Sequence, residues 1–272
     1  MSEYQLQELS AIKERQQQAW AAGDFALLGT KIVLVSEQLC EAVDLRPGQK
    51  VLDVATGSGN TALAAARREC EVTGTDYVAA LIERAKLRAA TERLQIDFHQ
   101  GDAEDLRFPD ASFDAVLSTF GAMFAPHQEK AAGEMLRVCR SGGKIGMASW
   151  TPDSFVGELF KTTSRYLPPP PNLKSPSLWG TEDRLRELFG AAIASLQTVR
   201  RSFVFRFLSA DHWLEFHRTH FGPMVKTYEL LSRADGENLS RDLLALVGRY
   251  NRSGDKTAII PSDYLEVVAV KR

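Results

Sequence analysis

The 272-residue chain has the composition of an ordinary globular protein, with 44% hydrophobic and 25% charged residues. A formal net charge of −2 gives no reason to expect a nucleic acid or an acidic membrane as partner. No apolar run is long enough to span a bilayer, and the polar N-terminus resembles neither a secretory signal nor a transit peptide. Cys40, Cys70 and Cys139 include no CxxC pair, which favours buried thiols in a reducing, cytoplasmic setting over a metal site or disulfides.

Two helices are expected at the N-terminus, over residues 5–21 and 27–42. From residue 51 to residue 150, short β-rich runs then alternate with helical stretches. The predicted strands cover 51–54, 72–75, 96–99, 115–118 and 144–150, and the predicted helices 61–68, 79–94 and 129–139. Strands separated by helices of this length predict a doubly wound α/β fold, a Rossmann-like parallel sheet with helices on both faces.

The last third of the chain adds a helix over residues 181–189 and two strands, over 203–207 and 263–270, which would bring the sheet to seven mostly parallel strands. Between these two strands, helices are predicted over residues 211–220 and 241–250. We therefore expect one domain, 1–272, with a core of about 31–207 and 257–272 and a helical cap of about 1–30 and 208–256. Such a cap would cover the carboxyl ends of the strands, where open α/β sheets bind ligands.

The most informative segment is residues 51–60, VLDVATGSGN, in which a strand runs into a glycine turn and then a helix. Gly57 and Gly59 let the backbone adopt positive φ and let a ligand approach closely. The helix that follows offers unpaired N–H groups and the positive end of its dipole. Such a turn can hold a carboxylate or a phosphate.

Two kinds of cofactor fit this turn. The spacing Gly57-x-Gly59-x-x-Ala62, with Asp76 17 residues after Gly59, also matches a dinucleotide fingerprint, so an NAD(P)-dependent oxidoreductase is one alternative. Asp53, four residues before Gly57, argues against it, because a carboxylate there would repel a diphosphate. The charge of Asp53 suits a cofactor that carries an α-ammonium and a sulfonium group, which favours S-adenosylmethionine.

Residues 51–60 resemble the first motif of class I S-adenosylmethionine-dependent methyltransferases. The variant D-x-A-x-G-x-G is similar to that of the ubiquinone/menaquinone biosynthesis methyltransferase-like group, and the resemblance covers about residues 45–150. The chain departs from the commoner pattern at Ala55, where a glycine is usual, and at Asn60, where several relatives have an acid. Two further segments, residues 108–114 and 136–143, resemble the family's approaches to its fourth and fifth strands.

The resemblance implies specific contacts with the cofactor. Asp76 would bond both ribose hydroxyls, Tyr77 would pack on the adenine, Asp102 would accept from the adenine amino group, and the Ala103 N–H would face a ring nitrogen. Ser118, Thr119 and Phe120, at the end of the fourth strand, would lie beside the methionine portion. The expected cofactor-binding residues are Asp53, Ala55, Gly57, Gly59, Asn60, Asp76, Tyr77, Asp102, Ala103 and Ser118.

A member of this family would transfer a methyl group by SN2 displacement to a small-molecule acceptor, and the aromatic residues expected near the pocket favour an apolar or aromatic one. A non-catalytic protein that binds S-adenosylmethionine is a further alternative. His217 and His220, three residues apart on one helical face, are the candidates for a general base, and no metal is expected there. The sequence leaves the acceptor molecule, the acceptor atom and the oligomeric state open.

Overall fold

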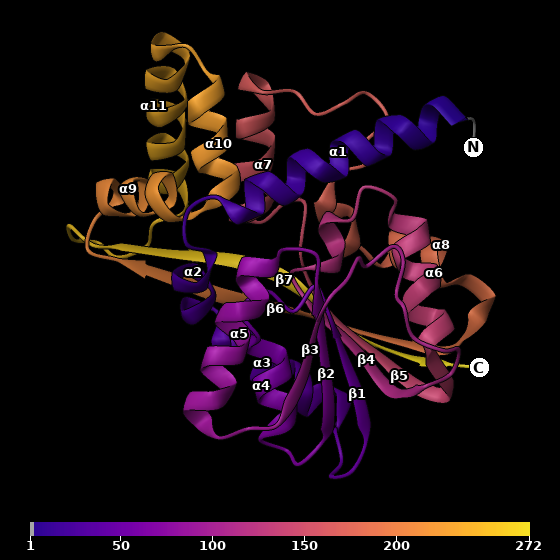
Figure 1. Ribbon diagram of the computed structural model, residues 1–272. Helices are drawn as coiled ribbons and strands as arrows, with labels where there is room; N and C mark the ends of the chain where they lie inside the picture. Colours follow the sequence, from indigo (N-terminus) through magenta and orange to yellow (C-terminus); the bar gives the residue numbers. More distant parts are fainter. Residues whose placement is uncertain (1–2) are drawn as a thin grey trace.

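A seven-stranded sheet organises the molecule (Figure 1). The computed structural model describes the backbone of residues 3–272 and the side chains from residue 9 onward. The strands are β1 (Lys50–Val54), β2 (Glu71–Asp76), β3 (Ile96–Gln100), β4 (Phe113–Thr119), β5 (Cys139–Trp150), β6 (Ile193–Phe207) and β7 (Ala258–Lys271), in the order β3-β2-β1-β4-β5-β7-β6. β1 to β5 are parallel, and β7 is antiparallel to both of its neighbours. The predicted doubly wound, mostly parallel sheet is confirmed.

Helices cover both faces of this sheet. They are α1 (Glu3–Ala21), α2 (Phe25–Lys31), α3 (Val33–Val43), α4 (Asn60–Ala66), α5 (Ala79–Glu92), α6 (Gln128–Val138), α7 (Phe155–Tyr166), α8 (Glu182–Phe189), α9 (Ala210–His220), α10 (Gly222–Leu230) and α11 (Arg233–Tyr250). α3, α4 and α5 pack on one face, and α6 and α8 on the other (Figure 1). The small alanines of α4 are buried, which lets this helix lie close to β1 and brings the glycine turn to the sheet edge.

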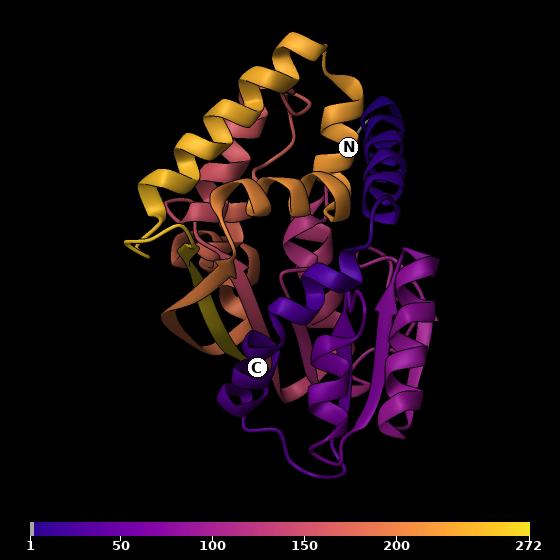
Figure 2. The ribbon, with the colours of Figure 1, turned by 90° about the vertical axis from the view of Figure 1, so that its left-hand side faces the viewer.

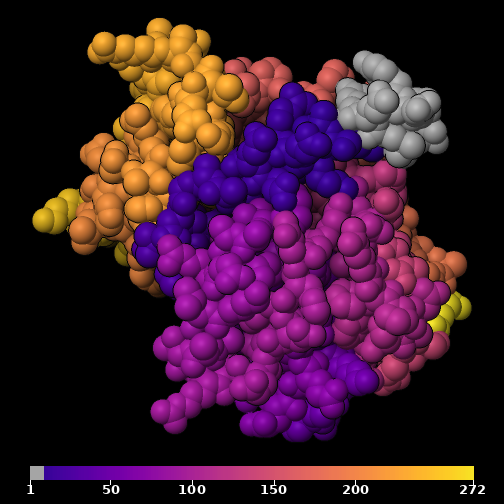
Figure 3. Space-filling model, in the orientation of Figure 1, coloured from indigo at the N-terminus to yellow at the C-terminus, as the bar shows by residue number. Residues whose placement is uncertain are grey.

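A second layer of helices lies beyond the carboxyl ends of the parallel strands (Figures 1 and 2). α9, α10 and α11 are inserted between β6 and β7, where the sequence predicted helices. α1 packs along α10, and α7 packs against α11 although it falls within the range expected for the core. In the space-filling view, α1 lies across the molecule between α5 and the inserted helices (Figure 3). α1 is thus placed over the edge of the sheet to which the glycine turn belongs.

Several predicted elements differ in extent from those observed. The helix predicted over residues 27–42 is divided at Ile32, which leaves helical geometry with φ −107° and ψ 13°. The strand predicted over 203–207 is the end of the 15-residue β6, whose first part is polar and exposed because it forms the edge of the sheet. That exposed part shows no alternation of apolar and polar residues, but its backbone pairs with β7 along almost its whole length. α7 has no counterpart among the predicted helices.

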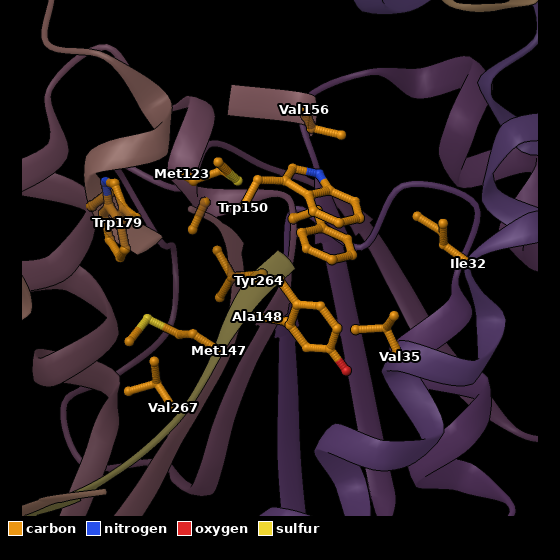
Figure 4. Packing of buried hydrophobic residues seen from close by; sticks show 14 of the residues in the cluster. Ile32, Val35, Met123, Met147, Ala148, Trp150, Val156, Trp179, Tyr264 and Val267 are labelled. Carbon is orange, nitrogen blue, oxygen red and sulfur yellow. The ribbon is translucent and has the colours of Figure 1, made fainter. Parts of the chain in front are cut away.

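Aromatic side chains form the packed floor behind the carboxyl ends of β4 and β5. Phe120 stacks on Trp150 with ring centroids 3.9 Å apart and an interplanar angle of 1°. Tyr264 meets both rings edge-on, and its hydroxyl donates to Gln38 Oε1 at 3.0 Å. Figure 4 shows Trp150 and Tyr264 together, with Val35 of α3 beside Tyr264. This packing fixes the backbone from which the loop after β4 departs.

Candidate functional site

The glycine turn after β1 is held in a left-handed backbone conformation. Ala55, Gly57 and Gly59 have φ values of 54°, 56° and 89°. For Ala55 this geometry costs of order 1 kcal/mol, and the surrounding structure must enforce it. Gly121 follows β4 and approaches this turn so closely that a Cβ on it would lie 2.5 Å from the Ala55 carbonyl oxygen. The two strand ends therefore meet at a place where neither loop has room for larger side chains.

Asp53 of β1 is buried beneath this turn, and only one of its two carboxylate oxygens has partners. Oδ2 accepts from the Thr56 hydroxyl and from the Ala62 N–H, the latter at 2.9 Å. Oδ1 is buried and has no hydrogen-bond partner. Burial raises the pKa of Asp53 from 3.8 to about 7, and the nearby Asp76 carboxylate adds to the shift while the two hydrogen bonds oppose it. The side chain presents an unpaired acceptor to whatever occupies the adjoining space.

Asp76, at the end of β2, closes the other side of the turn. Its Oδ2 accepts from the Gly57 N–H and its Oδ1 from the Val78 N–H, each at 2.9 Å. Burial raises the pKa of Asp76 to about 6, against the effect of these two bonds. The bonds leave each oxygen with a second lone pair. Asp76 therefore fixes the turn and can still accept from a ligand.

A third acid, Asp102, follows β3 and is tied to the N-terminal helix. Its Oδ1 accepts from the Glu104 N–H at 2.9 Å. Lys13 of α1 places its Nζ 2.6 Å from Asp102 Oδ2 and 2.7 Å from Glu104 Oε2. Burial opposes the charge on Lys13, but the two carboxylates outweigh it and raise the pKa of Lys13. Gln17 adds a bond from its Nε2 to the Tyr77 carbonyl. These contacts hold α1 at the ends of β2 and β3. They could not be seen in the sequence, because 89 residues separate Lys13 from Asp102.

These groups surround an open cavity. Among the predicted cofactor residues, its wall includes Asp53, Ala55, Gly57, Asn60, Asp76, Tyr77, Asp102 and Ala103. Side chains of α1, α2, α3 and the break between α2 and α3 also line it, although the sequence did not single them out as cofactor-binding; they are Lys13, Gln16, Trp20, Phe25, Ile32 and Ser36. Lys13, Gln16 and Trp20 are spaced at three and four residues, so one face of α1 forms the roof.

Gly59 and Ser118 do not line the cavity; they support its wall. Gly59 caps α4, and a Cβ on it would lie 3.1 Å from the Cβ of Ala85. The Ser118 hydroxyl donates to the Val54 carbonyl at 2.8 Å and accepts from the Ala122 N–H at 2.9 Å. Ser118 therefore joins the ends of β1 and β4, while its neighbours Thr119 and Phe120 line the cavity.

The two histidines proposed as general bases do not reach this cavity either. His217 is buried in α9 among aromatic rings, and its Nδ1 bonds the Trp213 carbonyl at 2.8 Å. Burial lowers the pKa of His217 to about 4, so its ring is neutral at physiological pH. His220 packs against Phe216, and neither histidine belongs to the cavity wall. Their spacing on one helical face reflects packing, and a base role for either has no support in this arrangement.

Within residues 3–272, no helix is both long and apolar enough to cross a membrane. The side chains from residue 9 onward contain no cluster of three or more histidine, cysteine, aspartate or glutamate residues that could hold a metal ion.

Comparisons with known proteins agree with this geometry. The family described as a methyltransferase domain matches residues 51–143. An uncharacterized protein of Mycobacterium tuberculosis is 36% identical over 262 residues, which cover 93% of each chain. A demethylmenaquinone methyltransferase of Deinococcus radiodurans is 34% identical over 125 residues, 44% of this chain and 52% of that protein. The crystal structure of the YcgJ protein from Bacillus subtilis is similar in fold, with a TM-score of 0.60 at 21% identity over 87% of this chain and 98% of that one.

The cavity fits the cofactor of this family. The unpaired Oδ1 of Asp53 suits a cationic ammonium group and would repel a pyrophosphate, which disfavours the NAD(P) alternative. Asp76 and Asp102 lie at the ends of adjacent strands, where the ribose and adenine of such a cofactor would be held. The chain belongs to the class I S-adenosylmethionine-dependent methyltransferases, and it is an enzyme whose cofactor is S-adenosylmethionine.

Proposed function

We propose that the enzyme methylates a small, apolar or aromatic molecule. The observation that carries this proposal is the composition of the cavity wall beyond the three aspartates. There Trp20 meets Phe25 and Phe124 edge-on, with ring centroids 5.2 and 4.9 Å away, and all three side chains line the cavity. Phe120 and Ile32 complete this apolar end. A flat apolar acceptor would bury its faces against these rings.

The remaining wall is assigned to the cofactor. Asp53 would hold the ammonium group, Asp76 the ribose hydroxyls and Asp102 the adenine amino group, with Tyr77 beside the adenine. Ala55, Gly57, Asn60 and Ala103 would contribute backbone and close contacts. Gly59 and Ser118 keep this wall in shape, as described above.

The titratable side chains that line the cavity, among the residues described, are Lys13, Asp53, Asp76, Tyr77 and Asp102. All five are engaged at the cofactor end. The cofactor supplies an activated methyl group on a sulfonium, so the chain has to align the acceptor and exclude water. We infer that the acceptor reacts as a neutral nucleophile or loses its proton to solvent, with no side chain acting as base.

We also propose that the inserted helices α9–α11, together with α1 and α7, form a cap, and that among these helices α1 supplies the side chains that line the cavity. The segment between α1 and α2 supports this division, because Gly23 takes φ 67° and the Asp24 N–H bonds the His220 carbonyl at 3.0 Å. This segment ties the end of α1 to the end of α9, which is where a hinge would act. Three buried free cysteines fit a reducing compartment such as the cytoplasm.

The experiment is a screen for transfer of an isotope-labelled methyl group from S-adenosylmethionine to phenols, quinols, thiols and amines. We expect transfer to aromatic acceptors, and we expect Trp20→Ala to raise their KM more than that of S-adenosylmethionine. An exposed aliphatic residue on another helix, changed as Leu87→Ala, is the matched control. Transfer only to macromolecules, or to small polar amines with no effect of Trp20→Ala, would contradict the proposal.

A further inference from the structure

Gln16, on the helix α1 that forms the roof, brings an unused hydrogen-bond acceptor into the cavity. Its side chain lines the cavity, and its Oε1 is buried without a hydrogen-bond partner among the described residues. Buried polar atoms in proteins are almost always paired, because an unpaired amide oxygen that has lost its water costs free energy. The oxygen of Gln16 is therefore placed to accept from a molecule bound in the cavity.

The position of Gln16 on α1 lies between the two ends of the cavity. Lys13, three residues earlier on the same helical face, reaches Asp102, where the adenine is expected. Trp20, four residues later on that face, meets the Phe124 ring with centroids 4.9 Å apart. Because a helix rises by about 1.5 Å per residue, Gln16 lies about 4.5 Å along the axis from Lys13 and about 6 Å from Trp20. Gln16 therefore faces the middle of the cavity, one turn away from the aromatic end.

The hydrogen-bond donors of the cofactor already have acceptors in the proposed function. Asp53 is assigned to its ammonium group, Asp76 to its ribose hydroxyls and Asp102 to its adenine amino group. Gln16 adds an acceptor that none of these donors requires, and this acceptor is uncharged. An amide oxygen can accept a hydrogen bond but does not take up the proton at physiological pH. It thus suits a neutral O–H or N–H group on the second ligand, the methyl acceptor.

We propose that Gln16 accepts a hydrogen bond from an O–H or N–H group of the methyl acceptor, so that the enzyme selects aromatic molecules that carry such a donor. The proposal rests on the proposed function, in which an aromatic acceptor lies against Trp20. The ring would pack on Trp20 while its hydroxyl or amine group, one helical turn away, pairs with Gln16 Oε1. An ether of similar shape would leave that oxygen unpaired, and a site built to bind a donor rejects an analogue that lacks it.

The test compares two probes by isothermal titration of the protein saturated with S-adenosylhomocysteine. 2-Naphthol carries an O–H donor, and its methyl ether, 2-methoxynaphthalene, lacks it. We expect wild type to bind 2-naphthol about tenfold more tightly than the ether. Gln16→Met keeps the length of the side chain and removes the acceptor, so it should abolish this preference. Gln16→Glu should retain the preference, because a carboxylate oxygen also accepts.

Gln18→Met is the matched control, since Gln18 lies on the exposed side of the same helix and outside the cavity wall. It should show the wild-type preference, and Gln16→Met should bind S-adenosylhomocysteine as wild type does. If Gln16→Met fails to fold, the preference of wild type and of Gln16→Glu still decides the question.

Equal binding of the two probes by wild type would overturn the proposal and leave the aromatic acceptor of the proposed function intact. A preference that persists in Gln16→Met would also overturn it. So would weaker binding of S-adenosylhomocysteine by that variant with an unchanged preference, which would assign Gln16 to the cofactor. Failure of wild type to bind either probe would refute the aromatic acceptor itself, and this proposal with it.

Discussion

Asp53→Asn isolates the role of the buried carboxylate, because asparagine fills the same space without the charge. Its side-chain oxygen can continue to accept from Thr56 and Ala62, while the amide replaces the unpaired Oδ1. This change should make the cofactor-free protein more stable and should weaken the binding of the cofactor. That opposition distinguishes a functional carboxylate from a structural one.

The magnitude follows from the raised pKa of Asp53. Folding moves this pKa from 3.8 to about 7, a shift of about three units or about 4 kcal/mol. The folded protein holds the proton more tightly than the unfolded chain does. The contribution of Asp53 to stability is therefore complete below pH 3.8 and is lost as the pH rises through about 7. Above pH 7 the buried, ionised side chain destabilises the folded protein, and Asp53→Asn removes this effect.

The assay is chemical unfolding of the cofactor-free protein between pH 5 and pH 8.5. As the pH rises towards 7, wild type should lose stability relative to Asp53→Asn. The difference in their unfolding free energies should change by up to about 1.4 kcal/mol per pH unit. Titration with S-adenosylmethionine should show weaker binding by the variant. For wild type at pH 6, binding should release about one proton, since the ammonium favours the ionised carboxylate. Asp105→Asn, an exposed acid outside the cavity wall, is the control.

The reasoning would be refuted by an Asp53→Asn variant that binds S-adenosylmethionine as wild type does. It would also be refuted if wild type and variant showed parallel stability against pH. A loss of stability in the variant at pH 8, together with the loss of binding, would show that the carboxylate serves mainly to hold the turn.

Three further predictions concern the neighbours of the cavity. Lys13→Met should lower the free energy of unfolding by about 2–3 kcal/mol, because it leaves the buried Glu104 without its cation; denaturant unfolding measures this. It should also weaken cofactor binding, which titration measures. Asp76→Ala should weaken S-adenosylmethionine strongly and cost about 1–3 kcal/mol for each backbone N–H left without an acceptor; unchanged affinity would remove Asp76 from the site. His217→Phe should leave the pH profile of kcat/KM unchanged. Loss of the acidic limb of that profile in a folded variant would reinstate His217 as a base.

Much of the fold could be predicted because the parallel strands are short apolar runs and the helices between them are regular. The motif residues Asp53, Asp76 and Asp102 could likewise be placed, since each follows or ends a strand on the same edge of the sheet. The edge strand β6 was underestimated because exposed strands lack the alternation that marks a half-buried one. Its pairing with β7 is a tertiary property.

The roof of the cavity could not be predicted from local pattern. Lys13 contacts Asp102 across 89 residues, and nothing around Lys13 in the sequence marks it as more than a polar residue of a helix. The histidines of α9 were misleading for the opposite reason. Their local spacing is typical of a site, but burial among aromatic rings gives His217 a packing role. The roles of Lys13 and His217 both depend on contacts with residues that local sequence pattern does not reveal.

The central claim is that the methyl group goes to a small apolar or aromatic molecule. It is tested most directly by incubating the enzyme with isotope-labelled S-adenosylmethionine and a cell extract, and measuring the label in the small-molecule and macromolecular fractions. Label that enters aromatic small molecules, and disappears with Trp20→Ala, is the predicted result. Label found only in protein or nucleic acid would contradict the account.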